Sequence, residues 1–125
     1  MSTDDFKTEH WPTEIRLKTR EKTLEVDFDD GSRFALPAEL LRVESPSAEV
    51  QGHGPGEKTL IAGRRHVGIM AIEPVGNYAV RIKFDDLHDT GIFSWSYLYR
   101  LGRDKERLWQ DYLERLAERG LSRDP

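Results

Sequence analysis

The sequence predicts a small α+β domain, mostly antiparallel β, with a short helix after the third strand and C-terminal helices packed on the sheet. Two observations carry this prediction. Apolar residues alternate with polar ones in several short stretches, the pattern of strands that bury one face. Near the end they recur at spacings of three and four, the pattern of an amphipathic helix. The 125 residues suit one domain with its own core.

Three alternating stretches predict an N-terminal three-strand meander. They are centred on Ile15 and Leu17, on Leu24, Val26 and Phe28, and on Phe34 and Leu36. Asp30-Gly31 lies between the last two stretches, and Asp-Gly between alternating runs is a strong hairpin signal. Residues 1–12 have little apolar content and end at Pro12, which lacks a backbone N–H. We therefore expect residues 1–12 to form a flexible lead-in.

The middle of the chain predicts one short helix and a loop. Pro37 suits the first position of a helix that Ala38–Val43 would complete. The glycine-rich stretch Val50–Lys58 has no periodicity, so we expect a loop there. Thr59–Ala62 is expected to form a short strand that leads into the centre of the domain.

A central hairpin is predicted from Ile69–Val75 and Tyr78–Phe84, which Gly76-Asn77 would join as a two-residue turn. A polar corner, residues 85–89, follows the second strand. The short apolar stretch Gly91-Ile92-Phe93 comes next, and Ser94 stands where a helix N-cap is expected.

Two C-terminal helices complete the prediction. The first should end at Gly102, and the second should begin near Asp104, whose carboxylate can cap free N–H groups. Gly120 is expected as its C-cap. The apolar stripe of this second helix consists of Leu108, Trp109, Tyr112, Leu113 and Leu116. We expect one domain over residues 13–120 and a tail at 121–125.

Composition excludes several classes of function. The sequence has no cysteine, so disulfides and thiolate metal sites are excluded. Its net charge of −4 creates no field that attracts nucleic acid. No apolar run approaches the ~20 residues of a membrane span, and the acidic start Met1–Asp5 differs from a secretion signal. We therefore expect a cytoplasmic protein that binds neither nucleic acid nor membrane.

Two sequence motifs, one of nucleotide-binding proteins and one of hydrolases, are incomplete or absent. Residues 52–59 approximate a phosphate-binding loop, but Glu57 replaces the glycine before Lys58, and a strand-like segment follows. The serines lack the G-x-S-x-G turn of hydrolases. These departures favour a plain loop and give no support to nucleophilic catalysis.

A metal site is the alternative that the histidines leave open. His88 lies among Asp85, Asp86 and Asp89, and these carboxylates could bind zinc or iron with it. His53 or His66 could assist. The spacing is not diagnostic, and turn-forming aspartates at a solvated corner explain the same cluster. A separate basic cluster, Arg64-Arg65-His66, could meet an acidic partner.

Several motifs together resemble the gamma-butyrobetaine hydroxylase-like N-terminal domain family, over Thr13 to about Glu118. The matching motifs are Leu41-Arg42, Gly63-Arg64-Arg65, the run Ile72–Arg81, Phe84-Asp85-Asp86 and the run His88–Trp95. One departure is Leu87, where many members have glycine. The resemblance implies a compact, mostly β domain that occurs alone, fused to iron–sulfur cluster carriers, or at the front of carnitine-pathway dioxygenases.

In those dioxygenases the resemblance implies a zinc module, in which Cys-Pro-Cys-x-x-Cys joins one distant histidine. The cysteine positions correspond here to Ser45, Ser47 and Val50, and the histidine corresponds to His88. Hydroxyls and an isopropyl group do not replace thiolates on zinc. We therefore expect a degenerate zinc site and predict no cofactor.

The resemblance also bears on activity, because the dioxygenase reaction belongs to a separate catalytic domain. The preferred hypothesis is a non-catalytic accessory or interaction module that binds a protein partner. Its expected contact surface comprises Arg64, Arg65 and the corner at His88. The competing hypothesis is the metal-binding protein described above.

Overall fold

The computed structural model describes residues 9–52 and 58–125. The described residues form two three-stranded antiparallel sheets, in the orders β1-β2-β3 and β4-β5-β6, together with four helices. The strands are β1 (Pro12–Lys18), β2 (Thr23–Phe28), β3 (Arg33–Pro37), β4 (Ile69–Val75), β5 (Ala79–Phe84) and β6 (Ile92–Ser94). The helices are α1 (Ala38–Val43), α2 (Ala48–Gln51), α3 (Trp95–Arg103) and α4 (Lys105–Glu118). The predicted α+β class is confirmed.

The N-terminal meander forms as predicted. Leu24, Val26 and Phe28 on β2 are buried, and the residues between them face outward with partial exposure. Gly31, with a φ of +87°, closes the hairpin to β3. β1 already begins at Pro12, so the last residue of the expected lead-in belongs to the sheet. Residues 1–8 lie outside the described part of the chain.

The central hairpin has a longer turn than predicted. Val75 pairs with Ala79, so residues 76–78 form a three-residue connection, and Tyr78 lies in the turn rather than in the strand. Gly76 has a φ of +53°, which glycine adopts without the steric cost of a side chain. The short apolar stretch becomes β6, which pairs with β5 and completes the second sheet.

The segment between the sheets differs most from prediction. α1 covers Ala38–Val43 as predicted, but Pro37, expected as the first helical residue, ends β3 instead. The helix α2 was not predicted, and it takes up the first two residues of the expected loop Val50–Lys58. Residues 53–57 of that loop lie outside the described residues. The predicted strand Thr59–Ala62 is wrong, because these residues belong to an irregular segment that extends from residue 58 to residue 68.

The predicted end of the first C-terminal helix is also wrong. α3 continues through Gly102 to Arg103. A Cβ on Gly102 would come within 2.2 Å of the Phe34 ring, so this glycine allows α3 to lie close against β3. Ser94 caps α3 as predicted and accepts a hydrogen bond from the N–H of Tyr97 at 3.1 Å.

The helix α4 begins at the predicted place but without the predicted cap. The Asp104 carboxylate pairs with Arg103 and Arg107 instead of capping backbone N–H groups. At the other end, Gly120 has a φ of +64° and donates to the carbonyl of Ala117, while Leu121 donates to that of Leu116. This is the Schellman arrangement, so the predicted C-cap is confirmed.

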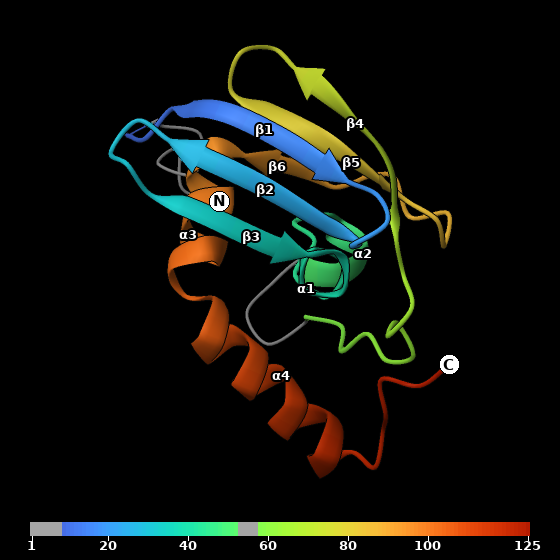
Figure 1. Ribbon diagram of the computed structural model, residues 1–125. Coiled ribbons are helices and arrows are strands. Elements are labelled where there is room, and N and C mark those ends of the chain that lie inside the picture. Colours follow the sequence, from blue (N-terminus) through green and yellow to red (C-terminus); the bar gives the residue numbers. More distant parts are fainter. Residues whose placement is uncertain (1–8, 53–57) are drawn as a thin grey trace.

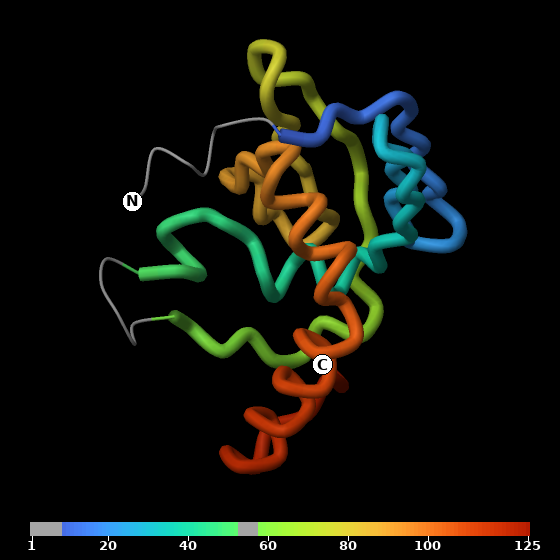
Figure 2. The backbone as a smooth tube through the Cα atoms, turned by 90° about the vertical axis from the view of Figure 1, so that its left-hand side faces the viewer, coloured from blue at the N-terminus to red at the C-terminus, as the bar shows by residue number. Residues whose placement is uncertain are grey.

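One apolar core lies between the two sheets, and a second lies between α4, the end of α1 and residues 60–62. The main core combines residues of both sheets with α3, and Figure 1 shows β1, β2 and β3 in front of β5 and β6. The stripe of α4 packs chiefly on Val43 and on residues 60–62, with Tyr112 and Leu116 buried. Figure 2 shows residues 58–66 passing between α2 and α4. The irregular segment therefore supplies the surface on which α4 packs.

Candidate functional site

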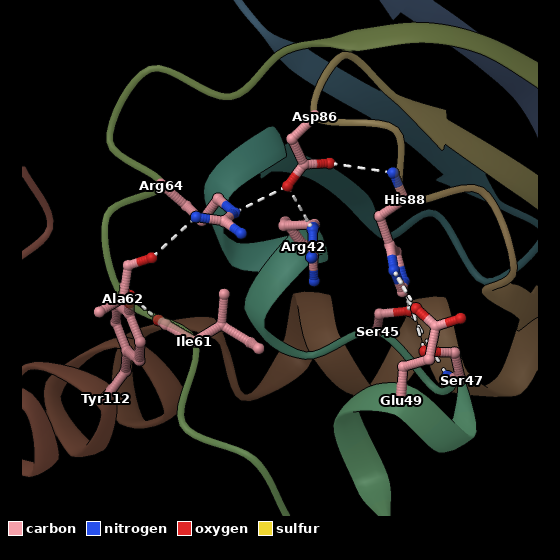
Figure 3. A network of polar contacts seen from close by, with 10 residues as sticks. All are labelled: Arg42, Ser45, Ser47, Glu49, Ile61, Ala62, Arg64, Asp86, His88 and Tyr112. Atoms are coloured by element: carbon pink, nitrogen blue, oxygen red, sulfur yellow. Dashed lines mark hydrogen bonds and ion pairs between the residues drawn. The ribbon is translucent and has the colours of Figure 1, made fainter. Parts of the chain in front are cut away.

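A buried histidine joins three segments that are distant in the sequence. His88 lies on the connection from β5 to β6, and its side chain is 2% exposed. Its Nε2 is 2.9 Å from the hydroxyl of Ser45 and 3.3 Å from that of Ser47, which lie between α1 and α2 (Figure 3). Ser45 is fully buried. We call these residues, with Glu49, the His88 corner.

The carboxylate of Glu49 defines the hydrogen-bond directions in the His88 corner. Its Oε2 lies 3.1 Å from Nδ1 of His88. An ionised carboxylate is only an acceptor, so Nδ1 carries the proton of the neutral ring and donates a hydrogen bond to Glu49. Nε2 is then bare and accepts from the serine hydroxyls. Both ring nitrogens are therefore satisfied by groups of the protein, as a buried imidazole requires.

The environment of His88 favours the neutral ring. Burial lowers the pKa of the imidazole, and the positive charge of Arg42 lowers it further. Glu49 and Asp86 act in the opposite direction but do not outweigh these two effects. The His88 corner is consequently a network of neutral donors and acceptors with one carboxylate at its exposed edge.

Asp86 supports His88 from the other side. Its Oδ1 accepts from the backbone N–H of His88, while its Oδ2 accepts from Arg42 and from Arg64, each at 2.7 Å (Figure 3). Burial alone would raise the pKa of this carboxyl, but these hydrogen bonds outweigh burial and lower it. Arg64 also donates to the carbonyl of Ala62. Asp86 thus connects the corner to α1 and to the irregular segment.

Two backbone positions make this corner possible. Leu87 has a φ of +74° and a side chain in solvent, at 89% exposure. The backbone therefore keeps a conformation suited to glycine, at a cost of about 1–2 kcal/mol for a residue with a Cβ. A Cβ on Gly91 would lie 2.4 Å from the Ser45 hydroxyl. Gly91 therefore leaves the space that this hydroxyl occupies.

The structure separates the residues of the predicted contact surface. His88 is buried, so its side chain is not available to a partner. Arg64 and Arg65 are partly exposed, at 35% and 39%. Arg64 pairs with Asp86, and Arg65 pairs with Asp124. The corner therefore positions Arg64 rather than contributing a surface of its own.

The predicted metal cluster does not assemble. Asp85, Asp89 and His66 are exposed, and Asp86 contacts the backbone of His88 rather than its ring. His53 lies outside the described residues. Among the residues that the structure describes, no group of three or more His, Cys, Asp or Glu side chains could hold a metal ion.

The four positions of the expected degenerate zinc site lie in one region. Ser45 and Ser47 contact the imidazole, and Val50 is buried on α2, three residues after Ser47. One imidazole, two hydroxyls and an isopropyl group do not fit a structural zinc ion, which requires thiolate or imidazole ligands here. Even so, Glu49 occupies the second ring nitrogen, as carboxylates do behind zinc-bound histidines.

Three polar pairs of this region were not predicted. Glu49 contacts His88, Glu44 binds Lys58 at 2.6 Å, and Glu39 binds Arg123. No local pattern signals them, because their partners are 14 to 84 residues away in the sequence. One usable signal is the position of Glu39 and Glu44 next to the apolar residues of a short helix, because a carboxylate that is buried there needs a cationic partner.

The fold and the His88 corner define a small α+β domain with a buried polar network. The family described as gamma-butyrobetaine hydroxylase-like, N-terminal, matches residues 15–99. The chain belongs to this family. The resemblance found in the sequence is therefore confirmed, and the match covers the N-terminal domain family without any catalytic domain.

Solved structures agree with this assignment. Two solution structures determined by NMR are 49% and 46% identical to the chain, with TM-scores of 0.82 and 0.81. They match 93% and 100% of this chain and 91% of their own chains. A crystal structure of a DUF971-family protein of unknown function from Acidithiobacillus ferrooxidans is 42% identical, with a TM-score of 0.62, and covers 73% of this chain and 91% of its own. No curated protein matches.

In the described ranges 9–52 and 58–125, no helix is both long and apolar enough to cross a lipid bilayer.

Proposed function

We propose that this chain is a non-catalytic protein-interaction module, acting in the cytoplasm as an accessory to larger machinery. The observation that carries the proposal is the His88 corner. Both nitrogens of its imidazole are bound by side chains of the protein itself, and the ring is 2% exposed. An imidazole held in this way joins segments of the chain, and it has no ring nitrogen left to act on a substrate. This supports a non-catalytic role.

Three side chains of the His88 corner lie in the same order as the catalytic triad of a hydrolase. Ser45, His88 and Glu49 form a hydroxyl–imidazole–carboxylate series like that of a catalytic triad. A nucleophile must reach a substrate carbonyl, however, and Ser45 is fully buried. Ser47 borders a cavity of about 590 Å³, but its hydroxyl makes the longer contact, 3.3 Å. The geometry therefore supports a structural role better than a catalytic one.

The contact surface proposed for a partner is centred on Arg64 and Arg65. Asp86 holds the Nε of Arg64 at 2.7 Å, and it does so from the corner that His88 stabilises. Two partly exposed guanidinium groups side by side in the sequence suit an acidic or polar protein surface. The resemblance to domains fused to iron–sulfur cluster carriers makes such carriers the first partners to test.

A pull-down from cytoplasmic extract tests this surface. Tagged wild-type protein is expected to retain at least one specific partner, and an Arg64→Ala/Arg65→Ala variant is expected to lose it. An Arg115→Ala/Arg119→Ala variant is the matched control, because it removes the same charge from the C-terminal end of α4 and the residue that follows it. The proposal would be contradicted if the wild type retains no partner, or if the Arg64→Ala/Arg65→Ala variant retains the same partners as the wild type.

Elemental analysis provides an independent comparison with the metal-binding hypothesis. Protein purified without an affinity tag is expected to carry less than a few tenths of an equivalent of any transition metal. A full equivalent of zinc or iron would instead support a metal-binding protein.

A further inference from the structure

The segment after α4 is held against the domain by polar contacts. The N–H groups of Gly63 and Arg65 donate to the carbonyls of Ser122 and Arg123, at 2.9 and 3.0 Å. A Cβ on Gly63 would lie 3.4 Å from the Cα of Pro125, so the two backbones run close together. Residues 121–125, expected as a tail, are therefore docked on the irregular segment.

Arg123 supplies the most specific contact of this segment. Its Nε and Nη2 bind the two carboxylate oxygens of Glu39 at 2.9 and 2.7 Å. The guanidinium also lies over the ring of Trp109, at 5.1 Å from the centroid. The Glu39 side chain is 7% exposed, and a buried carboxylate needs a cation beside it. A planar, bidentate partner such as guanidinium satisfies both oxygens at once.

The residue after Arg123 continues the pattern. Asp124 pairs with Arg65, and its backbone N–H binds the Ser122 hydroxyl at 3.0 Å. No apolar side chain of the segment is buried, and Leu121 is 44% exposed. Main-chain hydrogen bonds with a few charged side chains are the means by which domains recognise extended peptides. A segment held in this way can be exchanged for another of the same chemistry.

We propose that the surface formed by Gly63, Arg65, Glu39 and Trp109 is a peptide-binding site, and that residues 122–124 occupy it in cis. The ligand is an extended segment of a partner protein in which an arginine precedes an acidic residue. The arginine binds Glu39 and stacks on Trp109, and the acidic residue binds Arg65. The inference rests on the proposed interaction function and specifies the partner chemistry at Arg65.

Occupation in cis regulates this site. A tethered segment acts at an effective concentration in the mM range, so a partner peptide must compete with it. The wild-type protein therefore binds a free peptide weakly, and variants with a weakened segment bind it better.

The experiment titrates the isotope-labelled full chain with the synthetic peptide Gly-Leu-Ser-Arg-Asp-Pro and follows its amide NMR signals. The Arg123→Ala/Asp124→Ala variant is expected to bind at least tenfold more tightly than the wild type, with shifts at Gly63, Arg65 and the Trp109 indole. A peptide with alanine in place of its arginine is expected to bind at least tenfold more weakly. An Arg119→Ala variant, which leaves the segment intact, should behave as the wild type.

Three results would overturn the inference: no shifts at these positions in the folded variant, equal shifts with the alanine peptide, or a dimer that exchanges the segment between two copies. If the double variant is unfolded, Asp124→Ala is used under the same criteria, because that pair is exposed. The titration needs no cellular partner. A failed pull-down with peptide binding therefore contradicts the proposed function alone, and the reverse contradicts this site alone.

Discussion

Two buried polar side chains near the ends of α1, Glu39 and His88, are satisfied by different chemistry. At the start of α1, the buried carboxylate of Glu39 depends on Arg123, which comes from 84 residues further along the chain. After its end, Ser45 and the neutral ring of His88 satisfy each other without a net charge. The contact between Ser45 and His88 involves no buried charge, whereas a buried charge such as that of Glu39 destabilises the fold whenever its partner leaves. We therefore expect loss of the partner to destabilise the fold most at Glu39.

The largest effect on stability is expected from introducing thiolates near His88. Substituting Ser45→Cys, Ser47→Cys and Val50→Cys places a cysteine at each of the three corresponding positions, two of which contact His88, and leaves Glu49 behind the ring. We expect the triple variant to bind one equivalent of zinc, with a thermal midpoint that rises on zinc addition because structural zinc contributes directly to folding. Elemental analysis and thermal denaturation with and without zinc measure this.

The matched control carries the same three cysteines with His88→Ala. It should bind zinc much more weakly, since one ligand of four is missing. If the triple variant binds no zinc, or if both variants bind it equally, the interpretation of Ser45, Ser47, Val50 and His88 as a degenerate zinc site is wrong.

An intermediate effect is expected at the charged end. Arg123→Ala leaves the Glu39 carboxylate buried without its partner, and the expected loss is about 2–3 kcal/mol of unfolding free energy, reduced from the full value because Arg123 is partly exposed. Adding Glu39→Gln should recover at least half of that loss, because the neutral amide needs no counterion. Urea denaturation gives the values.

Arg119→Ala serves as the control for Arg123, and we expect it to change stability by no more than about 0.5 kcal/mol. A loss in Arg119→Ala as large as that in Arg123→Ala would show that the effect is not specific to the buried pair. Failure of Glu39→Gln to recover stability would argue against an unpaired charge as the cause.

The smallest effect concerns pH. Because the pKa of His88 is lowered in the folded state, the unfolded chain takes up its proton first as pH falls below about 6.5. The stability contributed by the neutral ring is therefore complete above that pH and is lost as pH falls through the folded pKa. Urea midpoints between pH 7.5 and 5 should decline in the wild type and decline less in His88→Gln. Parallel declines would exclude His88 as the source.

Local patterns were enough to predict most of the fold. The alternation in β2, the Ser94 cap and the Gly120 C-cap depend on neighbouring residues, and all three formed as expected. The errors arose where long-range packing decides. Gly102 faces Phe34 across two elements, so its role in close packing was not visible from its position in a helix pattern.

The candidate site was predictable only in part for the same reason. The resemblance grouped Ser45, Ser47 and His88, and the structure places their side chains in contact. It did not predict that Glu49 would bind the other ring nitrogen, nor that Arg123 would reach Glu39. Both contacts join residues whose spacing in the sequence carries no periodic signal.

Gly91 links two positions that are 46 residues apart in numbering, because a methyl group there would occupy the space of the Ser45 hydroxyl. A side chain at residue 45 whose γ atom takes the place of this hydroxyl therefore requires glycine at residue 91. Among relatives, glycine at 91 should accompany serine or cysteine at 45, and a larger residue at 91 should accompany alanine or glycine at 45. The pair would then change together during evolution, whether or not the domain binds a metal.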